Sequence, residues 1–246
     1  MSSEPRIVLI TGANSGVGLA TTEVLTTIPS TSASTTFHVI MTDRSLSKLD
    51  QARNRPHRPP RKQHHRHLLP PDDLPPRRAR RRVHPLGLFT TISSRIGHLD
   101  ALINNAAIGN SSDDVRDRFT HRLTKPYSIY VSSGARQLRS HRRPVSSASA
   151  STPSPKNPDA YHASKAALNM VALLEHRAHG HEINVFAMTP GFVVSNLRGT
   201  DENLRPWHGM AGDPMVAGRT LLSILQGERD ADAGAGLVHK DGVFGW

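Results

Sequence analysis

The run from Arg6 to Gly18, RIVLITGANSGVG, constrains the fold more than any other part of the chain. Four of its first five residues are aliphatic, which is typical of a buried strand, and a turn with three glycines follows at once. From Val17 to Ile28 the pattern predicts a helix, which Pro29 ends. A strand, a glycine-rich turn and a helix in this order suit phosphate binding, because free backbone amides gather at the helix N-terminus. The alternative, a tight turn without a ligand, stays open.

A second apolar run, from Phe37 to Thr42, predicts a second strand, so the first two strands form a parallel pair with a right-handed crossover. Asn157 and Pro158 are suited to the start of a helix that runs to about His179. Further strands are predicted over residues 99–104, 128–133 and 183–189, with a short last one within 236–243. The expected fold class is α/β, a Rossmann-type doubly wound parallel sheet in a single domain over residues 1–246.

Two stretches interrupt this pattern, and we expect both to be irregular or disordered insertions. Residues 52–86 hold eight prolines between Arg55 and Pro85 with almost no aliphatic periodicity, and residues 136–156 are rich in Arg, Ser and Pro. Such segments bury too little apolar surface to offset the entropy of ordering. The third strand of the sheet is therefore expected to be missing or degraded. The short, basic link over 110–126 likewise indicates that a crossover helix is missing.

The formal net charge of +11 comes from two segments. Residues 51–82 carry 11 Lys and Arg against two acids, and residues 116–143 carry eight against one, so the rest of the chain is mildly acidic. A basic arm for nucleic acid or an anionic surface is one interpretation. Residues 52–85 contain no aromatic side chain that could stack on bases, so a nucleic-acid partner is not expected.

Localisation and metal binding are constrained by what the sequence lacks. The start of the chain has too short an apolar run for a signal peptide, and no run approaches the ~18 residues that a membrane span needs. The absence of cysteine fits a reducing compartment, so a cytoplasmic location is expected. His64 to His67, HHRH, has no carboxylate beside it, and no metal site is expected.

Tyr161 and Lys165, in the run YHASK, lie one helical turn apart on one face. A cation within ~4–6 Å favours the ionised form of a phenol. The pair could therefore act as an acid/base near neutral pH. Taken alone, a tyrosine and a lysine at this spacing are more often a solvated helix face.

Asp43 and Arg44, after the second strand, give conflicting indications about a dinucleotide. An acid at this position can bind the ribose hydroxyls and repel a 2′-phosphate, which favours NAD. An arginine can pair with that phosphate, which favours NADP. The preference is slightly for NAD, and Asp43 could instead cap the next helix.

Five motifs occur in one order: TGANSGVG, NNAA at Asn104 to Ala107, VSS, YHASK, and PG at Pro190 and Gly191. In this combination the chain resembles the short-chain dehydrogenase/reductase family, and its last block is similar to carbonyl-reductase-like fungal members. The resemblance implies an NAD(P)-dependent oxidoreductase that transfers a hydride between the nicotinamide and an alcohol or carbonyl of a small molecule. The dinucleotide-binding residues that it implies are Thr11, Gly12, Ser15, Gly16, Val17, Gly18, Asp43, Arg44, Asn105, Tyr161, Lys165, Pro190, Gly191 and Val193.

The same resemblance implies the catalytic roles. Tyr161 matches the proton donor or acceptor, Ser133 matches the residue that orients the substrate carbonyl, and Lys165 matches the residue that binds the nicotinamide ribose and assists the tyrosine.

The chain also departs from the family. No asparagine occurs from Ser111 to Arg143, where the family has an asparagine of a proton relay, and Ser133 and Tyr161 lie 28 residues apart, about twice the family's spacing. We interpret the abrupt basic blocks as damaged family segments. A homo-oligomer is compatible with the sequence, although the usual dimer helix is missing. The alternative function is an inactive dinucleotide-binding protein or an interaction protein with a basic arm.

Overall fold

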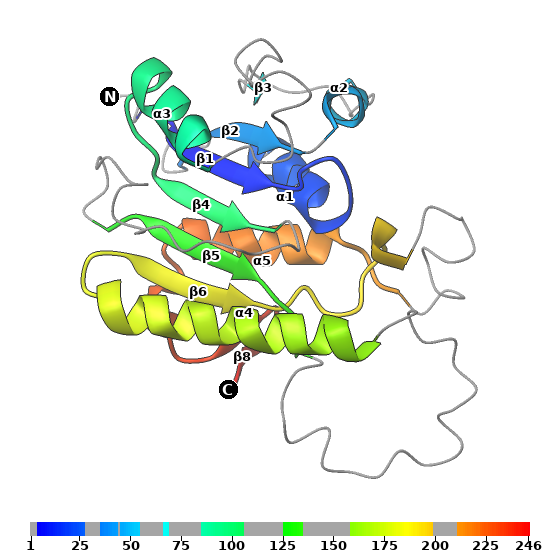
Figure 1. Ribbon diagram of the computed structural model, residues 1–246, viewed down its shortest axis with the longest axis vertical. Coiled ribbons are helices and arrows are strands. Elements are labelled where there is room, and N and C mark those ends of the chain that lie inside the picture. Colours follow the sequence, from blue (N-terminus) through cyan, green and yellow to red (C-terminus); the bar gives the residue numbers. More distant parts are fainter. Residues whose placement is uncertain are drawn as a thin grey trace.

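The computed structural model describes residues 4–27, 35–43, 45–54, 66–68, 85–105, 125–134, 158–198 and 211–246 (Figure 1). Its strands are β1 (Arg6–Thr11), β2 (Phe37–Thr42), β3 (Arg66–Leu68), β4 (Ala101–Asn104), β5 (Tyr127–Val131), β6 (Asn184–Met188), β7 (Leu237–His239) and β8 (Gly242–Phe244). Its α-helices are α1 (Gly16–Thr27), α2 (Leu46–Arg53), α3 (Pro85–Arg95), α4 (Pro158–His179) and α5 (Met215–Leu225). Its short 3₁₀ helices are η7 (Asn196–Arg198) and η8 (Asp230–Asp232).

The strands form one sheet in the order β3-β2-β1-β4-β5-β6-β7-β8. Every neighbouring pair from β3 to β7 is parallel, and β8 is antiparallel to β7. This confirms the expected α/β class and doubly wound parallel sheet. The order reverses at β1, which has β2 on one side and β4 on the other. In sheets of this kind a ligand crevice forms outside the carboxyl ends of the strands at such a point.

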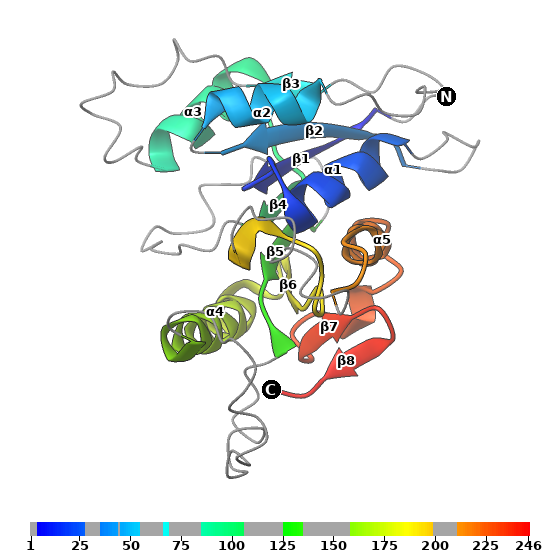
Figure 2. The same ribbon diagram turned by 90° about the vertical axis from the view of Figure 1, so that its right-hand side faces the viewer.

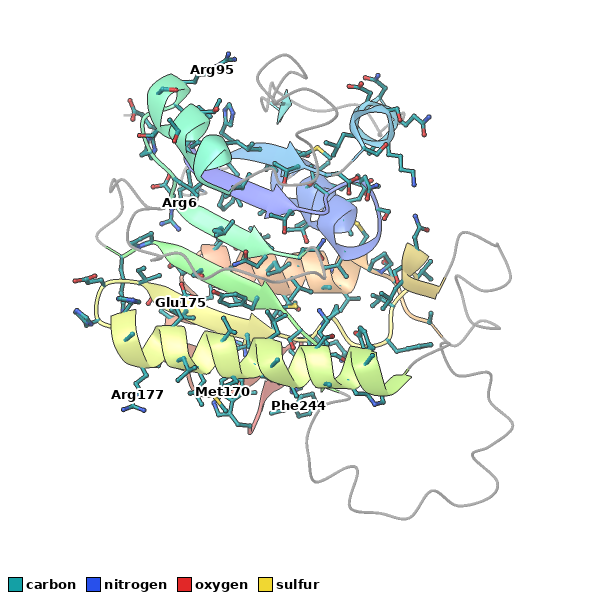
Figure 3. All side chains as sticks on the ribbon, viewed as in Figure 1. Arg6, Arg95, Met170, Glu175, Arg177 and Phe244 are labelled. Carbon is teal, nitrogen blue, oxygen red and sulfur yellow. The ribbon has the colours of Figure 1, made fainter. Side chains whose placement is uncertain are left out.

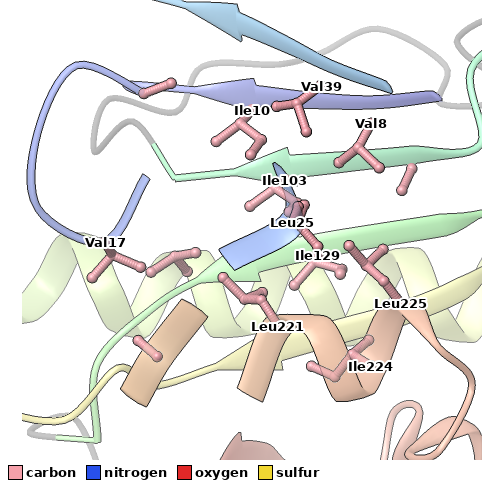
Figure 4. Packing of buried hydrophobic residues seen from close by; sticks show 14 of the residues in the cluster. Val8, Ile10, Val17, Leu25, Val39, Ile103, Ile129, Leu221, Ile224 and Leu225 are labelled. Carbon is pink, nitrogen blue, oxygen red and sulfur yellow. The ribbon is translucent and has the colours of Figure 1, made fainter. Parts of the chain in front are cut away.

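Alternate strand residues face opposite layers, so the sheet has two apolar cores. In the first, Val8, Ile10 and Ile129 pack against apolar residues of α1 and α5 (Figure 4). In the second, Leu9 and Tyr130 pack with buried residues of α3 and α4. Figure 2 shows α1 and α5 on one side of the sheet and α4 on the other. The residues of the central strands are almost fully buried, which explains why they read as continuous apolar runs.

The third strand, which was expected to be missing or degraded, is present but only three residues long. Strand β3 pairs in parallel with β2, with Val39 opposite Arg66 and Met41 opposite Leu68. The prediction required an apolar run, whereas pairing with the edge of β2 uses backbone groups that every residue except proline carries. Residues 66–68 contain no proline, although prolines stand at Pro60 and Pro70 on either side. Residues 55–65 and 69–84 lie outside the described residues.

The expected irregular insertion over residues 52–86 needs two further corrections. Helix α2 extends to Arg53, and helix α3 begins at Pro85, whereas order was expected to resume near Thr90. A proline suits the first turn of a helix, because its missing N–H has no partner there in any case. The second expected insertion, 136–156, and most of the link over 110–126 lie outside the described residues, so both remain predictions.

Helix α5 was not singled out from the sequence. It lies against α1, and the two helices approach closely at Gly218. A Cβ atom at Gly218 would lie 2.9 Å from Cγ2 of Val24 and 3.0 Å from the carbonyl oxygen of Ala20. The predicted last strand is a hairpin of β7 and β8. Within the described ranges, none of the helices combines the length and the apolar character needed to cross a membrane.

Candidate functional site

The glycine-rich turn between β1 and α1 is shaped by contacts that exclude side chains. Gly12 and Gly16 have φ of 66° and 56°, in the left-handed region that favours glycine. A Cβ atom on Gly18 would lie 2.5 Å from the carbonyl oxygen of Gly12 and 2.7 Å from Nδ2 of Asn105. The first turn of α1 contains no acidic residue. The turn therefore presents its backbone directly at the N-terminus of α1. The partial positive charge of that N-terminus is not offset by an acidic residue in the first helical turn.

Asn105 joins this turn to β4. Its Nδ2 donates to the carbonyl oxygens of Thr11 and Gly12, at 2.9 and 3.1 Å, and its backbone N–H donates to Oγ1 of Thr11 at 3.0 Å. These bonds link the carboxyl ends of β1 and β4, where the strand order reverses. Asn105 therefore braces the turn.

Tyr161 and Lys165 lie on α4 at the carboxyl end of β5. Nζ of Lys165 lies 5.9 Å from the centre of the Tyr161 ring and donates to the carbonyl oxygen of Val131 at 2.8 Å. Lys165 is only 6% exposed, and this burial lowers the pKa of its ammonium group from 10.5 to about 8. The structure thus places a buried cation beside the phenol.

The two serines that follow β5 differ in environment. Ser132 is buried, and its hydroxyl donates to Oδ1 of Asn169 at 2.5 Å, with the carbonyl oxygen of Lys165 at 3.3 Å. Ser133 is partly exposed at the carboxyl edge of the sheet. Ser133 is therefore the more accessible of the two serines, and its role toward a substrate remains a prediction.

The segment after β6 contacts both β5 and the glycine-rich turn. Oγ1 of Thr189 accepts hydrogen bonds from the N–H groups of Gly134, at 3.0 Å, and Gly191, at 3.3 Å. Gly191 has φ of 73°, so the chain turns sharply after Pro190. Val193 then forms a bridge with Gly212.

Farther along this segment, the chain reaches the first turn of α1. Ser195 packs against Gly16, where an added Cβ would lie 3.2 Å from Cβ of the serine. Thr189, Ser195 and Asn169 were not identified from the sequence. They are single polar residues in apolar or mixed runs, and no local spacing marks their partners.

Asp43 follows β2, and its Oδ1 accepts a hydrogen bond from the N–H of Ser45 at 2.9 Å. Ser45 is the N-cap residue of α2. The carboxylate therefore holds the turn into α2 without capping the helix as the alternative interpretation expected, and this contact does not exclude a role toward a ribose. Arg44 lies outside the described residues, so its expected pairing with a 2′-phosphate is untested. Ser15 and Val17 lie in the turn and the first helical residues as predicted.

The first prediction concerns the brace at Asn105. Replacing Asn105 by alanine leaves two carbonyl oxygens without their donor, and we expect the free energy of unfolding to fall by about 1–3 kcal/mol. Asn104→Ala is the matched control, because Nδ2 of Asn104 is buried and has no hydrogen-bond partner among the residues that the structure describes. Urea unfolding of both variants measures the difference. Equal losses would show that Asn105 is not a brace.

The second prediction concerns the buried ammonium of Lys165. The pKa of this group is about 8 in the folded protein and 10.5 when it is not buried. Between about pH 8 and pH 10.5, Lys165 therefore binds more protons in the unfolded chain than in the folded protein. Stability in this window should therefore rise with pH. The quantity to compare is the free energy of unfolding of the wild type minus that of Lys165→Met. We expect this difference to be constant below about pH 7 and to increase with pH above about pH 8. Urea unfolding at a series of pH values tests this, and a decrease over the same range would contradict it.

Comparison with known proteins gives a consistent result. The short chain dehydrogenase family matches residues 6–205. The short-chain dehydrogenase/reductase tropE of Talaromyces stipitatus is 31% identical over 190 residues, which cover 63% of this chain and 68% of that protein. Solved structures with the same fold include NADPH-bound carbonyl reductase from chicken fatty liver, with a TM-score of 0.61 and 19% identity over 99% of this chain and 100% of that one.

A second structure with the same fold is a short chain dehydrogenase of Shigella flexneri complexed with NADP, with a TM-score of 0.62 and 16% identity over 96% of this chain and 97% of that one. The site residues and these matches lead to one conclusion. The chain belongs to the short-chain dehydrogenase family.

Proposed function

We propose that this protein catalyses the NAD(P)-dependent interconversion of an alcohol and a carbonyl compound, with Tyr161 as the acid/base. The observation that carries the proposal is the placement of Lys165. Its buried ammonium lies 5.9 Å from the Tyr161 ring and is held by the carbonyl oxygen of Val131, two residues before Ser133. This geometry sets a cationic group beside the phenol that would exchange the proton with the substrate.

The glycine-rich turn fits the pyrophosphate of a dinucleotide. The close approach of Gly18 to Gly12 and Asn105 leaves no room for a side chain, so a ligand could approach the backbone of the turn directly. Thr11, Ser15, Gly16 and the amides at the start of α1 would hold the phosphate oxygens. The segment with Pro190, Gly191 and Val193 would hold the nicotinamide end. When bound, the nicotinamide supplies the hydride acceptor or donor.

The residues of this chain would then handle the proton and the oxygen. During oxidation, Tyr161 would take the hydroxyl proton of the substrate, while a bound nicotinamide would supply the acceptor for the hydride from the carbinol carbon. Ser133 would donate a hydrogen bond to the substrate oxygen and stabilise the charge that develops on it. Lys165 would keep its ammonium group beside the phenol. In reduction the same groups act in the opposite direction.

The third prediction tests Tyr161. Replacing it by phenylalanine removes the hydroxyl and keeps the ring, so we expect turnover of a carbonyl panel to fall by roughly 10²–10⁴-fold. Dinucleotide affinity should stay within about twofold, because the ring and the glycine-rich turn are unchanged. The control is Tyr127→Phe, since Tyr127 lies at the start of β5, away from Lys165, and bonds Asp230 of η8. Activity that survives in Tyr161→Phe would remove Tyr161 from the acid/base role. Dinucleotide binding by a wild type that reduces no compound of the panel would favour an inactive binding protein.

We further propose NAD as the preferred dinucleotide. Asp43 lies at the carboxyl end of β2, beside the turn after β1, and its bond to Ser45 fixes the carboxylate. A carboxylate there repels a 2′-phosphate and can accept hydrogen bonds from ribose hydroxyls. The NADP(H) bound by the chicken and Shigella proteins is a property of those proteins, which share the fold at under 20% identity.

The fourth prediction follows from the charge of Asp43. In a thermal-shift titration, we expect NADH to raise the melting temperature of the wild type at lower concentration than NADPH does. Asp43→Ser removes the charge and should reduce the difference between the two dinucleotides. A wild type that NADPH stabilises at lower concentration than NADH would contradict the preference for NAD, although not the proposed reaction.

A further inference from the structure

Asn169 lies one turn beyond Lys165 on the same face of α4, and the proposed reaction does not use it. Tyr161, Lys165 and Asn169 follow one another at intervals of four residues, so they form one row along the helix. The row continues at Ala172, which is only 2% exposed. Met170, beside Asn169 in sequence, is 54% exposed and points away from the sheet (Figure 3). Asn169 therefore belongs to the face that packs on β5.

Two neighbouring hydrogen bonds fasten this face to the carboxyl end of β5. Nζ of Lys165 donates to the carbonyl oxygen of Val131 at 2.8 Å, and the hydroxyl of Ser132 donates to Oδ1 of Asn169 at 2.5 Å. Consecutive residues of the strand are thus bonded to residues one turn apart on the helix. A slip of the helix by one residue would rotate it by about 100° and break both bonds.

These two hydrogen bonds join residues that are distant along the chain. In the sequence, 23 residues separate Gly134 from Pro158, the first residue of α4. The apolar contacts of the helix are less directional than a short hydrogen bond to a buried hydroxyl. The Ser132–Asn169 bond also lies next to the carbonyl oxygen of Lys165, 3.3 Å from the same hydroxyl.

We propose that Asn169 is a positioning residue, which through Ser132 holds Lys165 against β5 and so keeps its ammonium beside Tyr161. The inference rests on the proposed function for its catalytic meaning, but the positioning of the amine can be measured without any reaction. Asn169 does not touch the reacting atoms; its effect passes through α4 and the hydroxyl of Ser132.

The fifth prediction measures the amine directly. Trace acetylation of the apoprotein with acetic anhydride, read by mass spectrometry of the peptide that contains Lys165, reports how well the amine is held. We expect Asn169→Ala and Ser132→Ala each to raise the labelling rate of Lys165 about five- to tenfold, the effect of losing one net hydrogen bond. The double variant should be no faster than either single variant, because both remove the same bond. Asn169→Asp keeps the acceptor oxygen and should restore slow labelling.

Two controls separate positioning from general destabilisation. Met170→Ala changes the exposed face of the same helix, and Ile224→Val weakens the core at α5, on the opposite side of the sheet from α4. Neither should change the labelling of Lys165. The reference amine is Lys240, which is exposed and paired with Asp241. If Asn169→Ala labels Lys165 no faster than Ile224→Val does, the proposal is wrong; the Ser132→Ala variant decides the matter if Asn169→Ala does not fold.

The catalytic consequence has a separate test. With benzaldehyde and acetophenone as probes and NADH or NADPH in excess, we expect Asn169→Ala to lower kcat roughly ten- to a hundredfold while dinucleotide affinity and KM change little. Faster labelling without a change in kcat would overturn the link to Tyr161. A wild type without turnover on any carbonyl compound, but with the expected labelling pattern, would reject the proposed function and leave the positioning of Lys165 supported.

Discussion

Strand β1 is hydrogen-bonded along both edges, and the placement of every other element follows from this. It pairs in parallel with β2 on one side and β4 on the other, and its middle residues are fully buried. Parallel neighbours on both sides require crossovers in opposite directions, which leave a crevice where the order reverses. The chain enters this crevice at Gly12, and Asn105 ties the end of β4 to it. The position of the glycine-rich turn is therefore a consequence of the sheet topology.

Helix α4 carries a charged side chain, Lys165, whose burial lowers the stability of the fold. The ammonium of Lys165 is buried, and desolvation opposes its charge, which is why its pKa falls to about 8. A well-packed apolar residue at this position would avoid the desolvation penalty. The carbonyl oxygen of Val131 offsets part of it and fixes the amine at the end of β5. Buried charge at this edge of the sheet is typical of functional sites, where stability is given up for a local charge.

How far the sequence predicted the site depended on how local each signal was. TGANSGVG and YHASK indicated the turn and the helical pair correctly, because a left-handed glycine and a four-residue spacing have the same meaning in any context. The sequence indicated a missing or degraded third strand, since β3 pairs through its backbone on the edge of β2 and has no apolar pattern of its own. Helix α5, whose close approach to α1 depends on Gly218, was also overlooked.

The sequence by itself determined the strand–turn–helix unit at the start of the chain, the α/β class and the face of α4 that carries Tyr161 and Lys165. Those features depend on neighbours within a few residues along the chain. Only the tertiary structure decided that Ser132 bonds Asn169, that Thr189 bonds Gly134, and that Ser195 packs on Gly16. These contacts join residues 37, 55 and 179 positions apart. Their partners are chosen by the parallel register of the sheet, which brings the carboxyl ends of distant strands to one edge and which no local pattern encodes.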